Sequence, residues 1–288
     1  MSRQKFSVIP RLLRVKQWIK NFLVLVPCFA AGIEINWENS RLLLLGFLSF
    51  CFTSSIIYLI NDWHDQEADR LHESKSKRPI ASREVSGQFV LAICISLFSL
   101  LILLLLHQNA AFVMVIFVYA FNSLSYTFYL KKVPIMEFIS VSIGFILRGY
   151  AGATIFSINL SSWFLIVIWF SSLYLILGKR EAEFGRFPEG DHIRLVLNDY
   201  SSSFLKDSKL VSLSAALTSY CSWALYEKTD NVFTLLSVLP VTVFFFAYSI
   251  QLEKSKGESP EVIMLESRLI LLCLATMLVL LYLSTTFV

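Results

Sequence analysis

Long apolar runs alternate with short polar segments along almost the whole chain. A helix that crosses a bilayer needs about 20 mostly apolar residues, and the runs that approach or reach this length divide the chain into regular units. They are residues 19–35, 41–60, 87–106, 110–129, 134–156, 161–178, 210–226, 231–250 and 269–288. The pattern therefore predicts an all-α polytopic membrane protein with nine transmembrane helices, built as a single domain over residues 1–288.

The first of these runs is the weakest, because it is short and contains Pro27. A secretory signal peptide is its alternative interpretation, since a basic stretch precedes the run and small residues follow it. Trp18 and Lys20, which lie around the start of the run, and the eight further spans that follow it favour a membrane helix.

The composition agrees with the membrane class. Of 288 residues, 56% are hydrophobic and only 16% are charged, and the mean hydropathy is +0.65. A soluble domain carries about 25% charged residues, so a water-soluble enzyme, a disordered chain and a disulfide-stapled secreted module are excluded. The five cysteines lie in apolar runs at no metal-ligand spacing and read as buried hydrophobes. No nucleotide-binding glycine pattern is present.

The cations fall on alternate loops. Residues 1–20, 61–86, 130–133, 179–209 and 251–268 hold 22 of the 25 Lys and Arg residues. Positively charged loops stay in the cytoplasm. The amino terminus is therefore expected inside and the carboxyl terminus outside, in a bacterial-type cytoplasmic (inner) membrane. The two long basic loops, 61–86 and 179–209, are the expected active-site loops facing the cytoplasm.

The first long loop carries candidate metal ligands. If the preceding helix continues past the interface, Asn61, Asp65 and Asp69 share one stripe at i, i+4 and i+8, with Asp62 close to it. Hard oxygen ligands without His or Cys suit Mg²⁺, which completes its coordination with water and substrate phosphates. These four residues are the expected metal-binding and catalytic set.

A basic cluster follows at Lys75, Lys77 and Arg78, whose donors suit phosphate oxygens. A solvated loop of mixed charge is the alternative interpretation. Four metal-competent side chains at the membrane edge, followed by this cluster, favour a site for a metal and a diphosphate.

The motif N-D-x-x-D-x-x-x-D, followed by R-P-I-A-S, resembles the first signature of the UbiA-type intramembrane prenyltransferases. This resemblance implies nine transmembrane helices around a central cavity that opens near the cytoplasmic side. It also implies that the first acidic motif holds Mg²⁺ on a diphosphate.

The second long loop departs from the aromatic prenyltransferases of that superfamily, which carry a second aspartate-rich motif there. This chain has G-K-R-E-A-E-F-G-R from Gly178, then R-x-x-L-x-x-Y at Arg194, Leu197 and Tyr200. With R-V-K-Q-W-I-K-N near the amino terminus and G-E-S-P-E-V-I near the last helix, these motifs are similar to decaprenyl-phosphate phosphoribosyltransferases. That resemblance implies transfer of phosphoribose from phosphoribosyl pyrophosphate to a polyprenyl phosphate, with release of pyrophosphate.

The second loop also supplies candidate substrate-binding residues. Phosphoribosyl pyrophosphate is more negatively charged than a prenyl diphosphate, so its site needs extra cations. Lys179 and Arg180 supply them, and Glu183 and Arg194 are expected beside them. The chain departs from the usual pattern at three positions, with Glu73 in place of proline, Arg83 in place of glycine and Glu137 in place of aspartate.

Two charged residues lie within the fifth apolar run. A cation at the position of Arg148 costs about 3 kcal/mol on insertion scales, so it is expected to face a polar cavity and bind a substrate phosphate. Glu137 lies eleven residues earlier, about three helical turns, and is expected on the same side as a further substrate-binding residue. A purely structural pairing of Arg148 with a carboxylate is the alternative.

The fourth apolar run ends in a polar face. Asn122 and Tyr126 are four residues apart and Lys131 follows, an arrangement that resembles the polar fourth-helix face of the superfamily. All three are expected to bind substrate. Tyr119 and Tyr129 are interpreted instead as interfacial aromatic residues.

The expected mechanism uses Mg²⁺ to stabilise the leaving pyrophosphate while the polyprenyl-phosphate oxygen attacks the ribosyl carbon. The main alternative is an aromatic prenyltransferase that transfers a polyprenyl group to an acceptor such as 4-hydroxybenzoate. A membrane transporter is the second alternative, and an accessory protein with a degenerate site is the third. The expected partners are the two substrates and the bilayer, without nucleic acid. The sequence leaves lipid length, saturation and oligomeric state open, and a homo-oligomer is compatible with it.

Overall fold

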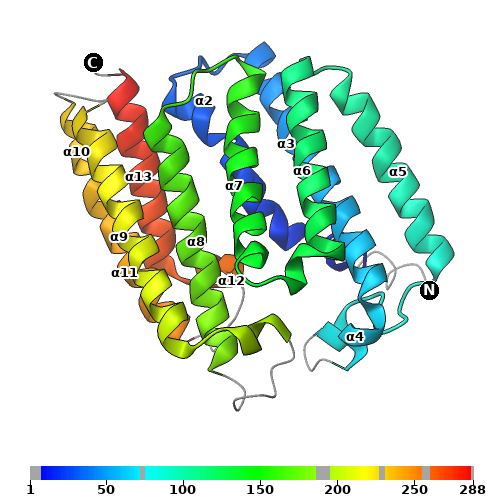
Figure 1. The fold of residues 1–288 in the computed structure, drawn as a ribbon. Coiled ribbons are helices and arrows are strands. Elements are labelled where there is room, and N and C mark those ends of the chain that lie inside the picture. The colour runs from blue at the N-terminus through cyan, green and yellow to red at the C-terminus, as the bar shows by residue number, and fades with distance from the viewer. Residues whose placement is uncertain (1–7, 72–74, 186–194, 227–230, 255–259, 287–288) are drawn as a thin grey trace.

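The computed structural model describes residues 8–71, 75–185, 195–226, 231–254 and 260–286, and every regular element in these ranges is helical. Seven helical segments are long and apolar enough to cross a membrane. They are α3 (Trp37–His64), α5 (Gly87–Leu105), α6 (Ala110–Phe128), α7 (Met136–Ile155), α8 (Ser162–Phe184), α10 (Val232–Leu236) continued by α11 (Val238–Lys254), and α13 (Arg268–Thr286). Their long axes run in nearly one direction (Figure 1).

The remaining two expected spans take other forms. The serine-rich α9 (Ser202–Tyr226) is long enough and packs along α8, but it is less apolar than the seven. Residues 19–35 do not form one helix. They divide between the 3-10 helix η1 (Val15–Val24) and the short α2 (Val26–Ala30), which has Pro27 in its first turn. The structure thus supports seven of the nine predicted spans by length and composition.

Short elements gather at one end of the bundle, where α3 ends and α4 (Gln66–Arg70) begins (Figure 1). The others at this end are η2 (Lys75–Lys77), η3 (Leu130–Lys132), η4 (Leu195–Asp199) and α12 (Pro260–Glu266), whereas the short α2 and α10 lie toward the opposite end (Figure 1). We call this the aspartate end, because Asp62, Asp65 and Asp69 lie there. The carboxyl terminus lies at the opposite end (Figure 1).

Side-chain caps fix where several of the long helices begin. The side-chain oxygens of Asn36, Ser86, Asn109 and Ser161 accept hydrogen bonds from backbone N–H groups in the first turns of α3, α5, α6 and α8. Such caps satisfy backbone donors that have no intrahelical partner and are worth about 1 kcal/mol each. The polar residues between the apolar runs therefore define the helix starts.

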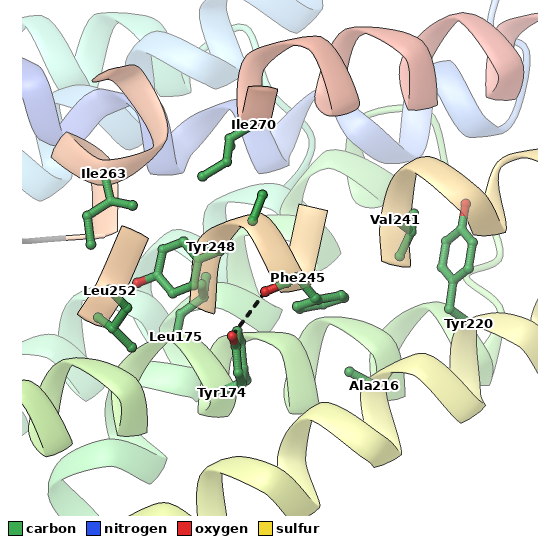
Figure 2. Packing of buried hydrophobic residues seen from close by; sticks show 11 residues of the cluster. Tyr174, Leu175, Ala216, Tyr220, Val241, Phe245, Tyr248, Leu252, Ile263 and Ile270 are labelled. Carbon is green, nitrogen blue, oxygen red and sulfur yellow. Dashed lines mark hydrogen bonds between the residues drawn. The ribbon is translucent and has the colours of Figure 1, made fainter. Parts of the chain in front are cut away.

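The core divides into clusters on the two sides of α7 and α8. One cluster joins η1, α3, α6 and α7 around Val24, Phe50 and Phe112. Another joins α8, α9, α11 and α13 around Tyr174 and Tyr248, and Figure 2 shows the hydroxyl of Tyr174 directed at the carbonyl of Phe245, 3.2 Å away. The helices that bear the site are thus held from both sides.

Arg83 has a left-handed backbone, with φ of 58°. That region favours glycine, and it costs other residues about 1 kcal/mol. The sequence departs from the usual glycine at this position, and the structure shows why glycine suits it.

We expect Arg83→Gly to raise the stability of the protein by about 1 kcal/mol, because the exposed arginine side chain would be replaced by a residue without the steric conflict. Thermal unfolding in detergent measures the change. Arg83→Ala is the control, since it removes the side chain but keeps the Cβ atom. An equal gain in both variants would show that backbone strain is not the cause.

Candidate active site

A cavity of about 900 Å³ extends from the aspartate end into the middle of the bundle. Its walls come from η1, α3, α6, α7 and α8, together with the segment after α4. Eleven of its lining residues are basic and three are acidic. The basic residues are Arg11, Arg14, Lys16, Lys20, Lys75, Lys77, Arg78, Lys131, Arg148, Lys179 and Arg180. The site is therefore strongly cationic.

The aspartate motif lies where α3 ends. The helix stops at His64, and Asp65 links it to α4, so the expected continuous stripe of Asn61, Asp65 and Asp69 does not form. Asn61, Asp62 and Asp65 line the cavity. Asp69 is buried beside Asp62 instead, because one Nη1 of Arg78 donates to both, at 3.1 Å to Asp62 and 2.5 Å to Asp69.

Each carboxylate of the motif is held by a cation. Arg14 donates through two nitrogens to the two oxygens of Asp62, with Nε at 3.2 Å. Lys131 Nζ lies 2.6 Å from both oxygens of Asp65, and His64 Nδ1 lies 2.8 Å from one of them. These charge-assisted contacts fix the carboxylates in the cavity wall.

Burial raises the pKa of Asp65, but hydrogen bonds and charge from Lys131 and His64 outweigh that effect, so its pKa lies below the usual value. A carboxyl with a lowered folded-state pKa stabilises the fold above its unfolded pKa of about 3.9, and that stabilisation is lost as the pH falls through the folded pKa.

We therefore expect Lys131→Met to destabilise the protein above the unfolded-state pKa of about 3.9, and the destabilisation to shrink as the pH falls and Asp65 becomes protonated in both proteins. Thermal unfolding measured across this range tests the prediction. Lys132→Met, at the adjacent exposed lysine, is the matched control. A destabilisation by Lys131→Met that is constant with pH would contradict the assigned pairing.

The residues of the first basic cluster face the cavity as expected. Lys75, Lys77 and Arg78 all line it, from η2 and the turn after it. Asn122 and Tyr126 of α6, with Lys131 of η3 just after it, line the same cavity. Asn122 is fixed by Ser140 of α7, whose carbonyl accepts from Nδ2 at 2.9 Å and whose hydroxyl donates to Oδ1 at 3.0 Å.

Glu137 differs from its expected position. It is fully buried, is not among the cavity-lining residues, and accepts both hydrogen bonds from Arg180 Nε, at 2.8 and 2.9 Å. Arg180 also donates to Glu183 at 2.7 Å, and Lys179 lies 3.9 Å from Glu183. The two carboxylates offset the positive charge that Lys179 and Arg180 were expected to supply.

Two residues of the R-x-x-L-x-x-Y motif pack near the start of α7, the helix that carries Glu137. Leu197 and Tyr200 are buried, and the hydroxyl of Tyr200 accepts the backbone N–H of Ile135 at 2.7 Å, just before α7 begins. This contact helps to place the start of α7, and with it Glu137. Arg194, also expected to bind substrate, lies outside the described residues.

Arg148 lines the cavity from the middle of α7, as expected. Its Nε donates to Asn21 Oδ1 at 2.8 Å, Nη1 to the Gly144 carbonyl at 2.7 Å and Nη2 to the Tyr119 hydroxyl at 2.7 Å. The alternative of a structural pairing with a carboxylate is not what the structure shows. Tyr119 is buried in the bundle, so its interpretation as an interfacial residue is wrong.

Sequence reasoning missed the contribution of η1. This segment places Arg14, Lys16, Lys20 and Asn21 along or beside the cavity. Ten residues is long for a 3-10 helix, and Arg14, at its start, has a left-handed φ of 51°. The R-V-K-Q-W-I-K-N motif was the available signal, because it places cations inside an otherwise apolar run.

The residue types at the aspartate end fit a divalent cation with hard oxygen ligands such as Mg²⁺. Among the residues that the structure describes, however, no three His, Cys, Asp or Glu side chains are grouped to hold a metal as they stand. Cations occupy the positions beside these carboxylates instead. Arg78 forms ion pairs with both Asp62 and Asp69, and Lys131 forms one with Asp65.

The chain resembles known proteins over most of its length. The UbiA prenyltransferase family matches residues 22–272. The chain is 34% identical to the decaprenyl-phosphate phosphoribosyltransferase of Mycolicibacterium smegmatis, over 92% of this chain and 88% of that protein. It is also 34% identical to the enzyme of the same name from Corynebacterium glutamicum, over 90% of this chain and 81% of that protein.

The fold has solved counterparts. A UbiA homolog from Archaeoglobus fulgidus, bound to DMAPP and Mg²⁺, superposes with a TM-score of 0.74 at 17% identity, covering 98% of this chain and 100% of that one. The sequence match over most of the chain and the shared helical fold lead to one conclusion. The chain belongs to the UbiA prenyltransferase family.

Proposed function

We propose that this protein transfers phosphoribose from phosphoribosyl pyrophosphate to a polyprenyl phosphate and releases pyrophosphate. As a member of the UbiA family, the chain is a transferase. The observation that carries the choice of substrates is the excess of eleven basic over three acidic residues in the cavity wall. A donor that carries both a pyrophosphate and a phosphate monoester, together with a lipid monophosphate, needs such an excess, whereas one diphosphate and a singly charged aromatic acceptor need far fewer cations.

The relatives support the same choice. Both are named as decaprenyl-phosphate phosphoribosyltransferases. In addition, the second loop of this chain carries Lys179, Arg180 and Glu183 where an aromatic prenyltransferase would need further aspartates. These features favour the phosphoribosyl transfer over the aromatic prenyl transfer and over a transporter.

In the proposed reaction, the phosphate oxygen of the lipid forms a bond to C1 of the ribose. The bond from C1 to the pyrophosphate oxygen breaks, and pyrophosphate leaves with the electron pair. The lipid phosphate is already anionic at pH 7, so the site needs no general base. Among the described residues that line the cavity, the carboxylates that could act as a base, such as Asp62 and Asp65, are already paired with cations. This agrees with a reaction that needs no general base.

The residues divide the work as follows. Asp62 and Asp65, with Asn61 and Asp69 beside them, would hold Mg²⁺, which when bound offsets the charge that develops on the leaving pyrophosphate. Lys75, Lys77 and Arg78 would bind the pyrophosphate oxygens, together with Lys131. If Arg78 and Lys131 contacted phosphate, Asp69 and Asp65 would become available to the metal, while Asp62 would keep its contact with Arg14.

The remaining substrate contacts come from α6 and α8. Asn122, Tyr126 and Lys179 line the cavity and would orient the ribose and the lipid phosphate. Glu137 and Glu183 would act through Arg180, whose guanidinium they hold in place. Arg194 stays a proposed contact on the strength of its motif alone.

We further propose that the chain forms one transmembrane domain in a bacterial-type cytoplasmic membrane, with loops 61–86 and 179–209 facing the cytoplasm. The basic segments at the aspartate end support this orientation. A cysteine introduced at exposed Glu67 should react with a membrane-impermeant thiol reagent only after the cells are opened.

A two-reaction assay tests the proposed function. Membranes that contain the protein receive Mg²⁺ and either labelled phosphoribosyl pyrophosphate with polyprenyl phosphate, or polyprenyl diphosphate with labelled 4-hydroxybenzoate. We expect the label to enter the organic phase in the first reaction only. Label that enters it in the second reaction only would establish the aromatic prenyltransferase instead.

A further inference from the structure

Arg148 is a buried cation without an ionic partner. Only 5% of the residue is exposed, and all its hydrogen-bond partners are neutral: Asn21, Gly144 and Tyr119. Its guanidinium also lies over the rings of Tyr119, at 4.7 Å, and Phe145, at 5.6 Å. Within the described chain, no carboxylate forms an ion pair with it.

An arginine has five N–H donors, and these contacts use three of them. One N–H therefore remains on each terminal nitrogen, and Arg148 lines the cavity. A guanidinium with two free donors in a low-dielectric wall binds two oxygens of a phosphate well. An unpaired cation inside a membrane helix is costly, so it is typically kept where a polar cavity or an anion compensates it.

The position of Arg148 is far from the aspartate motif. Its partner Asn21 also donates to Ser54 of α3 at 3.3 Å, and Ser54 lies eight residues before Asp62. At 1.5 Å per residue, this separates the two levels by about 12 Å along the helix axis. The cavity therefore has two cationic regions, one at the aspartate end and one deep in the bundle.

We infer that Arg148, positioned by Asn21 and Tyr119, forms a second anion site that takes the phosphate monoester of the sugar donor. This inference rests on the proposed function and deepens it, because the donor is a ribose with a pyrophosphate at one end and a phosphate monoester at the other. With the pyrophosphate at the aspartate end, the 5-phosphate points into the bundle toward Arg148. The site thereby selects a donor that is phosphorylated at both ends.

The lipid phosphate has the same chemistry but fits this position less well. A polyprenyl phosphate keeps its charged group near the membrane interface, whereas Arg148 lies in the middle of a membrane-spanning helix. The experiment below distinguishes the two sources.

The decisive variant is Asn21→Asp, which changes the shape of the side chain little. It places a carboxylate at the atom that now lies 2.8 Å from Arg148 Nε, so Arg148 gains an internal counterion. We expect the variant to fold with a melting temperature at or above that of the wild type. Its affinity for ribose 5-phosphate should fall about tenfold or more, as should its apparent affinity for phosphoribosyl pyrophosphate.

Binding is measured by calorimetry on the purified protein in detergent, with ribose 5-phosphate, with Mg²⁺ and pyrophosphate, and with a short-chain polyprenyl monophosphate. Binding of Mg²⁺ and pyrophosphate should be unchanged. Asn36→Asp, which adds the same charge at the exposed start of α3, is the matched control. Arg148→Gln is the second variant if Asn21→Asp fails to fold, and it should show the same selective loss.

Unchanged affinity for ribose 5-phosphate in a folded variant would overturn the inference. Loss of affinity for the lipid monophosphate alone would also overturn it and assign Arg148 to the lipid. A different result would contradict the proposed function alone. In that case the wild type would bind ribose 5-phosphate through Arg148 but would form no phosphoribosyl lipid.

Discussion

Asp65→Asn is expected to abolish turnover while leaving a folded membrane protein. The substitution removes the negative charge that would bind Mg²⁺ beside the leaving pyrophosphate, a contribution of several kcal/mol in metal-assisted reactions. A loss of about 4 kcal/mol corresponds to about a 1000-fold lower rate. Initial rates of phosphoribosyl transfer over a range of Mg²⁺ concentrations measure it.

Asp65 is the most informative member of the motif, because its side chain is 24% exposed and sits at the end of a helix. Asp62 and Asp69 are nearly buried and both pair with Arg78, so their replacement would also disturb folding. Glu67→Gln on the exposed side of α4 is the matched control and should keep normal activity. Near-normal activity of Asp65→Asn would rule out its role as a metal ligand.

Gly152→Ala is expected to cause the largest loss of stability. A Cβ atom at Gly152 would lie 1.9 Å from the carbonyl oxygen of Val24, and that atom belongs to the backbone. The clash cannot be relieved by a side-chain rotation, so η1 or α7 must shift, at about 3 kcal/mol or more. Because η1 carries Lys20 and Asn21, the shift should also weaken substrate binding.

Thermal unfolding and the yield of monodisperse protein measure this effect. Gly149→Ala on the same helix is the matched control, because the nearest atom to its Cβ is the Cδ1 of Ile168, the end of a flexible side chain, at 2.8 Å. We expect a mild effect there. Equal stability of the two variants would contradict the close approach of η1 to α7.

The membrane helices could be predicted from the sequence because their signal is local. The run predicted at 110–129 became α6 at Ala110–Phe128, and the run at 134–156 became α7 at Met136–Ile155. Length and apolarity decide such elements without reference to the rest of the fold. The segment 19–35 was different, because Pro27 and the close contact with Gly152 favour two short helices over one long helix.

Parts of the candidate site were predictable for the same reason. The cavity positions of Asp65, Lys131 and Arg148 follow from motifs and from the cost of charge in a membrane. The expected stripe through Asn61 and Asp69 was wrong, since it assumed that the helix continued beyond His64.

Contacts between distant segments of the chain could not be predicted from the sequence. Glu137 pairs with Arg180, 43 residues away, and Asn21 binds Arg148, 127 residues away. Neither the neutralisation of Arg180 nor the neutral surroundings of Arg148 could be inferred from local spacing. Tyr119 was misread as an interfacial aromatic residue, whereas it lies in the middle of α6 and its hydroxyl accepts a hydrogen bond from Arg148 inside the bundle.

The most direct test of the account is the stoichiometry of the reaction catalysed by the purified protein. Phosphoribosyl pyrophosphate, polyprenyl phosphate and Mg²⁺ should yield one pyrophosphate for each lipid that gains the mass of a phosphoribosyl group. Omission of the lipid phosphate, or use of Asp65→Asn, should stop both products together. Pyrophosphate release without the phosphoribosyl lipid, or a lipid product formed only from polyprenyl diphosphate and an aromatic acceptor, would contradict it.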